Sequence, residues 1–511
     1  MKREALGRAE KWCLATTIVC AAPLIVAPIW WHRLNADVVV SIPSPKLPSP
    51  NAYDSYVAAT QQLNSASKYW VHFATTPYQG NRAIPIMPAL PVRPFLTNSG
   101  KNVGVLTQRT EFSMKEKLRM LKWNASALPI LRKGFAFPYL QPPMRLDTYN
   151  KSPFGASPQT NGNVDYTAFI DLARVLVLQA QLQKARGDWN GALNTCLDGV
   201  RFGIDIPHGA PIQGAVIGQF IETLARAEVW PCVPHLSPAQ ARSAILRLQQ
   251  LQKRRVPAVQ TLQEEKWALQ AALVLEFRDP NWRNTLFNNR DAGPPTDLGM
   301  RTSFISKQDI IDRIGHNLDA QIANARLPYT RQQKVFEKPD PLDEILGVTS
   351  FLLDSNRFFI RCQAQSALLM TALALQAYRA EHKSYPPTLS ALVPRYLPAV
   401  PLDPFADHQP LHYKLRPLRY VSDIRHTLTG RMTRNRDYFR GAPSSISAKV
   451  PETKPHFEYS ISPYTLYSIG ANGKDDGGKP IENAAVTTSA RDRYATDFNQ
   501  SGDLVAGVNV Q

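Results

Sequence analysis

The sequence has few cysteines and lacks the short motifs that mark common enzyme families. Its five cysteines form no Cys-x-x-Cys pair and no Cys/His cluster, so a structural zinc site is not expected. It contains no Gly-x-Ser-x-Gly, no His-Glu-x-x-His, no Walker A loop and no glycine-rich dinucleotide fingerprint. The pair Glu264-Glu265 and the ten histidines could act as acids or bases, but a surface or core role is expected for each. The motifs therefore assign no biochemical activity.

The cysteine positions do not decide whether one disulfide forms. Cys13 and Cys20 lie in an apolar N-terminal segment, which leaves Cys196, Cys232 and Cys362. A disulfide between Cys196 and Cys232 can form if the compartment of the protein is oxidising. The sequence does not require this bond, so both alternatives stay open.

Acidic residues are also in short supply. The 511 residues include 41 Asp and Glu against 59 Lys and Arg, which gives a net charge of +18 and a pI near 9.7. Such a balance favours anionic partners, which are phospholipid headgroups, acidic polymers or nucleic acid. Nucleic acid is not expected, because the expected membrane topology places most of the chain outside the cytoplasm. A hydrophobic content of 44% is ordinary for a globular chain with room for two to four domains.

The N-terminus contains an uncharged apolar run, Trp12–Trp31. A helix rises about 1.5 Å per residue, so these 20 residues are long enough for the roughly 30 Å hydrocarbon core of a bilayer. The run is preceded by Lys2, Arg3, Arg8 and Lys11. The positive-inside rule then predicts a cytoplasmic tail (1–11), a transmembrane anchor (12–31) and an extracytoplasmic remainder. We expect a single-pass protein of the cell membrane.

Two other interpretations fit this segment less well. A cleaved signal peptide would have a shorter apolar run, and the only cleavage-like sequence, Leu34-Asn35-Ala36, directly follows Arg33. A processed prepilin would carry a hydrophobic residue after the leader glycine and a glutamate at the fifth mature position. Here Gly7 is followed by Arg8, and the fifth position is Trp12. The sequence thus favours an uncleaved anchor and argues against a pilin subunit.

Segment 32–162 is rich in proline, with 15 prolines between Leu34 and Thr160. Ser41–Pro50 is expected to be stiff and extended, since each proline fixes φ and disfavours helix at the preceding residue. Two helices are expected within the segment, over Ala52–Tyr69 and Ser113–Leu131. The many aromatic residues are atypical of a disordered linker. We therefore predict a stalk or an ordered, irregular segment that wraps against neighbouring helices.

Residues 163–345 are predicted to form an all-α helical domain. Apolar side chains recur there at three- and four-residue spacing. Ser237-Pro238-Ala239-Gln240 is a helix start signal, with Ser as N-cap and Gln completing a capping box. The expected helices are Tyr166–Arg186, Ala192–Ile204, Gly214–Trp230, one from Ser237 to the cluster Lys253-Arg254-Arg255, Pro257–Phe277 and Ser306–Ala325.

The last third carries a recognisable order of motifs. A helix ending at His382 leads into Tyr385-Pro386-Pro387, then Leu402-Asp403-Pro404-Phe405, then the glycine-rich Leu466–Gly478. Residues 355–511 thereby resemble the globular domain of the major pseudopilins of type II secretion systems, and the related C-terminal module of uncharacterised bacterial envelope proteins. The resemblance implies a long helix, a small antiparallel sheet and a location in the cell envelope.

The residues alone support a similar module. A helix over about 356–382 has small side chains on one face, which suits close packing of a sheet. Strands are expected at Leu411–Leu415, Phe457–Ser462 and Thr465–Ile469. An insertion at about 415–456 is basic, with a net charge of +6 over Lys414–Arg440. It is either a solvated loop or a contact for anionic lipid or cell-wall polymer. The predicted fold is mainly α with a C-terminal α+β module.

The loop after Ser468 is the candidate metal site. Asn472, Asp475 and Asp476 provide hard oxygen ligands, and Gly473, Gly477 and Gly478 permit a tight backbone. It is not an EF-hand, since the third position is Lys and the twelfth is Asn. The resemblance implies Ca²⁺ in the corresponding pseudopilin loop, but the further aspartates of that family are missing directly after the double glycine.

Asp503 could supply the missing carboxylate. The candidate Ca²⁺ ligands are then Ser468, Asn472, Asp475, Asp476 and Asp503. The alternative is a Gly/Asp turn that closes the sheet.

Two functions follow from these patterns. The first is a membrane-anchored, extracytoplasmic, non-enzymatic protein that acts as an interaction or scaffold component of the envelope. The second is an exported, membrane-tethered hydrolase with its site between the proline-rich segment and the helical domain. Two convergent carboxylates or a histidine pair in a deep pocket would favour the hydrolase, and a flat helix-lined surface would favour the scaffold.

Overall fold

The computed structural model shows a mainly helical protein with a small antiparallel sheet late in the chain. This agrees with the predicted fold class at that level. The residues described are 32–75, 84–85, 106–107, 112–142, 164–287, 305–333, 355–407, 409–415, 421–422, 457–458, 464–479 and 502–507. The predicted anchor (12–31) and nearly all of the basic insertion lie outside them. No helix in these ranges combines the length and apolarity needed to cross a bilayer.

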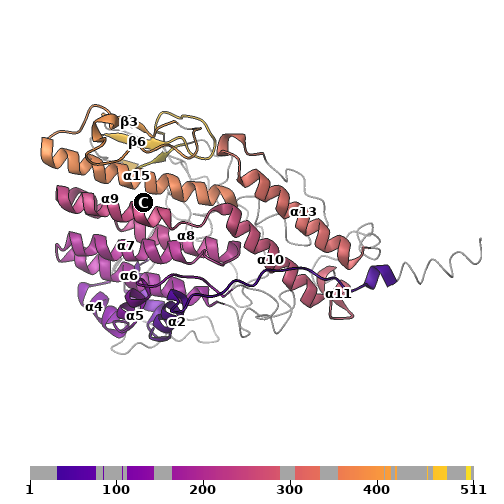
Figure 1. Ribbon diagram of the computed structural model, residues 1–511. Helices are drawn as coiled ribbons and strands as arrows, with labels where there is room; N and C mark the ends of the chain where they lie inside the picture. The colour runs from indigo at the N-terminus through magenta and orange to yellow at the C-terminus, as the bar shows by residue number, and fades with distance from the viewer. Residues whose placement is uncertain are drawn as a thin grey trace, which may run out of the picture.

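Long helices lie side by side in a row through the centre of the molecule (Figure 1). The row consists of α6 (Tyr166–Ala185), α7 (Trp189–Asp205), α9 (Pro238–Lys253) and α15 (Ser355–His382), which follow one another, together with α8 (Ile212–Ala227), which packs against α6, α7 and α15. Helix α7 packs against α6, α8 and α9, and α15 packs along α9 and α8. The short 3-10 helix η1 (Trp230–His235) joins α8 to α9 and contacts α7. The predicted helices of this region are therefore confirmed to within a few residues.

Local start signals explain where several helices begin. Ser237 accepts a hydrogen bond from the backbone N–H of Gln240, and the Gln240 side chain accepts one from the backbone N–H of Ser237. Ser306 and Asp309 form the same reciprocal box at the start of α13 (Lys307–Ala325). Such caps satisfy backbone donors that have no partner inside the helix. The helix start predicted at Ser237 is confirmed.

Small residues let α7 and α8 approach each other closely. A Cβ atom added to Gly199 would lie 2.7 Å from the Cβ of Ala225, and one added to Gly203 would lie 2.4 Å from the carbonyl oxygen of Gly218. Any larger side chain at these two glycines would push the helices apart. The spacing of α7 and α8 thus depends on these small residues.

The proline-rich region forms shorter helices than predicted. Its helices are α2 (Ala52–Gln61), α3 (Lys68–Thr75), α4 (Met114–Trp123) and α5 (Ala127–Gly134). The prediction of two continuous helices was wrong, since each is interrupted, between α2 and α3 and between α4 and α5. Asn124 connects these two interruptions by hydrogen bonds. Its amide oxygen accepts from the N–H of Asn64 (3.0 Å), and its amide nitrogen donates to the Ser67 hydroxyl (3.0 Å). These long-range bonds compete with helix continuation.

The extended segment before α2 lies across another group of helices. This group contains α10 (Ala258–Glu276), α11 (Trp282–Phe287) and α13. Val38 and Val40 pack against its buried core, and Arg283 donates to the Asn35 side chain over 3.1 Å. The extended conformation agrees with the proline pattern. The described chain begins at the end of the molecule where α11 lies (Figure 1).

The main sheet has the strand order β3-β6-β7 and is antiparallel throughout. Its strands are β3 (His412–Lys414), β6 (Thr465–Ser468) and β7 (Leu504–Val505). Strands at 411–415 and 465–469 were predicted, but β7 was not. The strand predicted at Phe457–Ser462 is described only as β5 (Phe457–Glu458), which pairs with β4 (Val421–Ser422) instead of the main sheet. A further pair joins β1 (Ile84–Pro85) to β2 (Leu106–Thr107).

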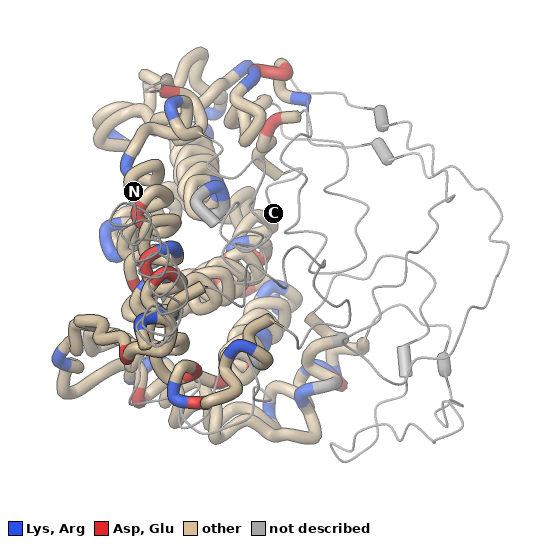
Figure 2. Tube along the Cα trace, turned by 90° about the vertical axis from the view of Figure 1, so that its right-hand side faces the viewer, with Lys and Arg blue, Asp and Glu red and all other residues tan. Residues whose placement is uncertain are grey.

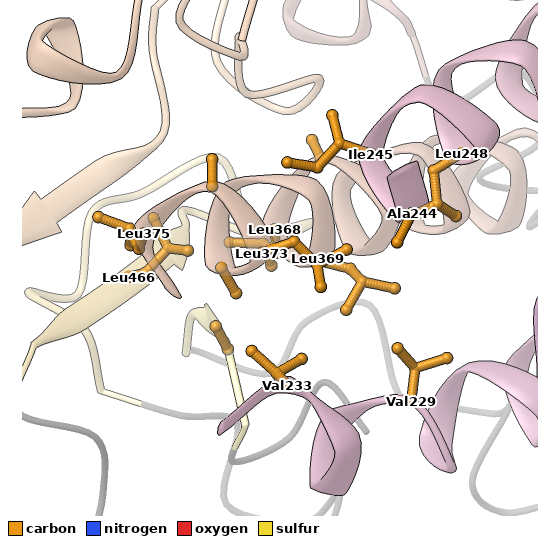
Figure 3. Packing of buried hydrophobic residues seen from close by; sticks show 14 of the residues in the cluster. Val229, Val233, Ala244, Ile245, Leu248, Leu368, Leu369, Leu373, Leu375 and Leu466 are labelled. Carbon is orange, nitrogen blue, oxygen red and sulfur yellow. The ribbon is translucent and has the colours of Figure 1, made fainter. Parts of the chain in front are cut away.

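Acidic and basic residues are interspersed along the described helices (Figure 2), so ion pairs can form between neighbouring helices. The apolar core beneath them is continuous from α7 to the sheet. Leu368 and Leu369 of α15 lie between α9 and the segment around Val233, and Leu375 approaches Leu466 of β6 (Figure 3). The two predicted regions 163–345 and 355–511 therefore share one hydrophobic core, since α15 packs on helices as well as on the sheet.

Candidate functional site

A buried carboxylate, Asp403, holds the candidate loop against the sheet. Asp403 is 1% exposed. Its oxygens accept hydrogen bonds from the Ser468 hydroxyl (2.7 Å), the N–H of Ile469 (2.8 Å) and the N–H of Phe405 (3.0 Å). Ser468, a predicted Ca²⁺ ligand, thus contacts Asp403. Sequence reasoning noted the Asp403-Pro404-Phe405 turn only as part of a resemblance and gave Asp403 no role.

Asn472 and Asp476 contact each other within the loop. The Asn472 side-chain amide donates to Oδ2 of Asp476 over 2.8 Å, and the N–H of Gly502 donates to the same oxygen over 2.8 Å. The amide oxygen of Asn472 accepts from the N–H of Lys474 (3.1 Å). Asp476 therefore connects the loop to the segment that enters β7.

Asp503 lies beneath the loop and is fully buried. Its Oδ2 accepts from the N–H of Gly478 (2.6 Å), and its Oδ1 from the N–H of Asp476 (3.3 Å). Burial raises the pKa of Asp503 to about 6, and the neighbouring charges of Asp476 and Asp475 act in the same direction against the two backbone donors. The predicted grouping of Asp503 with the loop is present in the structure.

Asp475 points to a different part of the sheet. Its Oδ1 accepts from the Tyr467 hydroxyl (3.0 Å) and the N–H of Gly477 (2.8 Å), and its Oδ2 lies 3.5 Å from Nδ1 of His412. Partial burial acts to raise the pKa of Asp475, but these donors and the charges of His412 and Lys414 outweigh it and lower the pKa. His412 and Tyr467, whose rings stack with centroids 4.9 Å apart, were not predicted as part of the site.

The described geometry fits a closed turn better than a cation cage. Each of the three loop carboxylates already accepts protein hydrogen bonds, and they face different donors. Over the described residues, no three His, Cys, Asp or Glu side chains are placed to hold one metal ion. Ca²⁺ binding would require Asp475, Asp476 and Asp503 to converge on one ion. It stays a prediction.

A second cluster lies between the proline-rich segment and the central helices, where the hydrolase alternative places its site. Asp205 at the end of α7 is fully buried. Its Oδ2 accepts from the Tyr56 hydroxyl (2.7 Å) and lies 3.5 Å from Nε of Arg201, and its Oδ1 accepts from Arg254 (2.9 Å). Tyr139 stacks on Tyr56, with ring centroids 5.2 Å apart. Burial, and next the charge of Asp205, raise the pKa of Tyr56 well above its usual value.

These contacts describe a charge-compensated junction. They combine one carboxylate with two guanidinium groups of opposite charge. General acid–base hydrolysis is usually performed by a pair of carboxylates or by a histidine whose pKa lies near the working pH. Sequence reasoning assigned none of Tyr56, Arg201 and Asp205 a role in a site, because Tyr56 and Asp205 are 149 positions apart and only folding brings them together.

A third buried cluster joins α8 to α15. Glu222 is 1% exposed and accepts from Arg226 and from Arg255 (2.6 Å), and the Ser366 hydroxyl donates to it over 3.4 Å. Arg226 also donates to Gln365. Burial acts to raise the pKa of Glu222, but the two arginines outweigh it and lower the pKa.

Other acids bridge neighbouring helices in the same way. Asp198 of α7 pairs with Arg132 of α5 (2.8 Å) and with Arg247 of α9 (2.6 Å). Glu228, just after α8, pairs with Lys184 of α6. In both cases one carboxylate connects elements that are far apart in the sequence.

The end of α15 is held by a similar group. Glu381 pairs with Arg242 of α9 and with Arg395 (2.6 Å), and it accepts from the Tyr396 hydroxyl (2.6 Å). Glu265, singled out in the sequence as a possible acid or base, accepts instead from the N–H of Ile212 (2.8 Å) at the start of α8. Burial raises the pKa of Glu265. These acids contact other elements of the fold.

Most of the predicted basic contact segment 414–440 lies outside the described residues. Lys414 itself lies on β3, and its ammonium donates to the carbonyl oxygen of Gly477 over 3.3 Å. Comparison with family models, curated proteins and solved structures finds no match for this chain. The function is therefore inferred from its own residues.

Proposed function

We propose that this protein is a single-pass, membrane-anchored extracytoplasmic protein that acts as a non-enzymatic scaffold in the cell envelope. The anchor rests on the uncharged Trp12–Trp31 run and the basic residues before it. The described chain starts at His32, at the end of the molecule where α11 lies (Figure 1). An anchor would place that end next to the membrane and the helical row beyond it.

The scaffold proposal rests on one observation: carboxylates of the helical row bridge basic side chains on different elements. Glu222, Asp198 and Glu381 each pair with two arginines. Geometries of this kind, with several donors per acid, hold helices in fixed relative positions. A fixed row of helices presents a constant outer surface, which is what a scaffold needs. Contact with anionic lipid or cell-wall polymer through 414–440 is part of the proposal, since the net charge is +18.

The anchor can be tested by topology. A reporter that is active only outside the cytoplasm, fused after Gln511, should be active, and a cytoplasmic reporter at the same position should be inactive. The full-length protein should resist extraction with alkaline carbonate. A matched variant in which Lys2, Arg3, Arg8 and Lys11 are replaced by Gln should lose part of this orientation preference. Recovery of a soluble form that begins near Asp37 would rule out the anchor.

The exported hydrolase is kept as a second candidate because the Asp205 cluster lies where that hypothesis puts its site. Tyr56→Phe removes the hydroxyl that donates to Asp205 and retains the ring that stacks on Tyr139. The full chain would be assayed with ester, glycoside and peptide substrates. A scaffold gives no turnover with either protein. Turnover by the wild type that is lost in a stably folded Tyr56→Phe variant would replace the scaffold by the enzyme.

A further inference from the structure

Two buried cysteines lie on adjacent elements of the central core. Cys196 on α7 is 2% exposed and Cys232 on η1 is fully buried, and both are free thiols belonging to the same hydrophobic cluster. Helix α7 contacts η1 directly. The sequence does not decide whether these residues form a disulfide, but the packing of α7 against its neighbours indicates how the two cysteines lie.

Two contacts fix how α7 lies against α8 and η1. Near one end, Trp189 stacks on His235 with ring centroids 3.8 Å apart. Further along α7, a Cβ on Gly199 would lie 2.7 Å from the Cβ of Ala225. Residue numbers rise along α7 as they fall along the facing segment, so the two run antiparallel. Cys196 lies between the two α7 positions, and Cys232 lies between the two facing ones.

Side-chain direction in an antiparallel pair favours an approach of the two sulfurs. Helical side chains lean toward the N-terminus of their own helix. In an antiparallel pair the leans are opposed, so Cys196 leans toward the level of Cys232 and Cys232 toward the level of Cys196. The Sγ of Cys232 lies 3.4 Å from the carbonyl oxygen of Glu228, one turn back, which shows this lean. The charges of Glu228 and Lys184 act on both thiols, and each thiol therefore lies near the same ion pair.

We propose that Cys196 and Cys232 are oxidised to a disulfide that joins α7 to η1. The proposal rests on the proposed extracytoplasmic location, because such bonds persist in oxidising compartments. One cysteine thiolate attacks a disulfide of an exogenous thiol–disulfide oxidant and forms a mixed disulfide. The second thiolate then displaces the oxidant as a dithiol. The two thiols lose two protons and two electrons, and the oxidant's disulfide accepts the electrons.

The bond forms during folding, before the core closes. Burial raises the pKa of Cys196 well above its usual value and that of Cys232 to about 11. Because the thiolate is the attacking species, the folded dithiol reacts slowly. Cys362 on α15 provides an internal control, since it is also buried and its pKa is also raised by burial.

The test uses the full chain in detergent. The reduced protein is unfolded in urea and refolded in a mixture of reduced and oxidised glutathione. Remaining thiols are alkylated under denaturing conditions, and peptides are analysed by mass spectrometry. The expected product is one disulfide-linked peptide pair containing Cys196 and Cys232, two hydrogens lighter than the dithiol, with Cys362 alkylated. Cys362→Ser should keep the pair, and Cys196→Ser should leave Cys232 alkylated. Alkylation of both Cys196 and Cys232 in the refolded wild type would overturn the proposal.

The same trapping on intact cells separates this proposal from the proposed location. A linked pair both in cells and after refolding supports the disulfide in an exported protein. A pair that forms on refolding but is reduced in cells overturns the disulfide of the native protein, and the reporter fusions then decide whether the location fails as well. A wild type that fails to pair on refolding overturns the disulfide, and the reporter fusions then test the anchor independently.

Discussion

Two buried carboxylates show how differently the helical row and the C-terminal loop treat negative charge. Glu222 in the row accepts from two arginines, which lower its pKa against the effect of burial. Asp503 in the loop accepts from two backbone N–H groups, and its pKa is raised to about 6 by burial and by neighbouring carboxylates. Arginine brings a full charge to the contact, whereas an N–H group brings only a partial charge.

The difference assigns different tasks to the two regions. Carboxylates of the row connect elements that are distant in sequence, which favours a fixed arrangement of helices. Carboxylates of the loop shape a turn around Gly477 and Gly478, both of which have positive φ angles of 77° and 92° that glycine adopts without strain. Excess negative charge remains only partly compensated in the loop. Added cations should therefore affect the loop more than the row.

The largest expected effect is the loss of the ionic junction at Glu222. Glu222→Ala leaves Arg226 and Arg255 buried without their carboxylate, and removal of one partner of a buried pair costs about 3–5 kcal/mol. The free energy of unfolding would be measured by urea denaturation of the full chain. Asp319→Ala is the matched control, because Asp319 is 58% exposed in its pair with Lys266 and exposed pairs contribute roughly 1 kcal/mol or less. Equal effects of the two substitutions would contradict a structural role for the junction.

The next effect is a pH dependence that comes from Asp503. The pKa of Asp503 rises from 3.8 to about 6 on folding, so the folded protein binds this proton more tightly than the unfolded chain. The contribution of Asp503 is therefore most favourable below about pH 4, and it falls as the pH rises to about 6. A shift of roughly two pKa units corresponds to at most about 3 kcal/mol.

The comparison of wild type with Asp503→Ala isolates the pH-dependent contribution of Asp503 to stability. The difference between their free energies of unfolding should shift in favour of the wild type when the pH is lowered from 7 to 5. Glu222 contributes with the opposite sign, because its pKa is lowered and its stabilisation is lost only as the pH falls through that lowered value. A difference that is constant between pH 7 and pH 5 would show that Asp503 does not titrate as stated.

A third effect concerns Ca²⁺, which would relieve the same excess charge. If the ion binds only the folded protein, stability rises by about 2.7 kcal/mol at a Ca²⁺ concentration of one hundred times Kd. The double variant Asp475→Ala, Asp476→Ala should lose this gain, and Mg²⁺ should substitute poorly because it requires a tighter octahedral shell. Thermal melts of the full chain with Ca²⁺ and with chelator provide the measurement. Identical melting curves with Ca²⁺ and with chelator would show that the loop is only a turn that closes the sheet.

Helix positions could be predicted because their signals are local. The capping box at Ser237 and the apolar stripes of α6 to α10, α13 and α15 depend on residues three or four positions apart. The loop residues Asn472, Asp475 and Asp476 could be grouped for a similar reason, since glycines and carboxylates that are close in sequence mark a turn. Asp503 lies 27 positions from Asp476 and was added only because the resemblance calls for a further carboxylate.

Long-range contacts could not be predicted in this way. The breaks joined by Asn124 depend on a hydrogen bond to Asn64, 60 positions away, and Ser468 donates to Asp403 across 65 positions. The packing of α15 on α9 was missed because a face of small residues suits a helix as well as a sheet. Local patterns specify which elements form, and such tertiary contacts decide how they combine.

We infer that α6 to α9 and α15 form one rigid body held by buried ionic junctions. Native-state hydrogen exchange of the full chain, followed as a function of low denaturant concentration, tests this most directly. Protected amides of α7, α8, α9 and α15 should merge into one opening transition with one free energy, because they share a core and the Glu222 junction. Exchange of α15 together with the sheet at a clearly lower free energy than α7 to α9 would contradict the account, since the C-terminal region would then open as a separate unit.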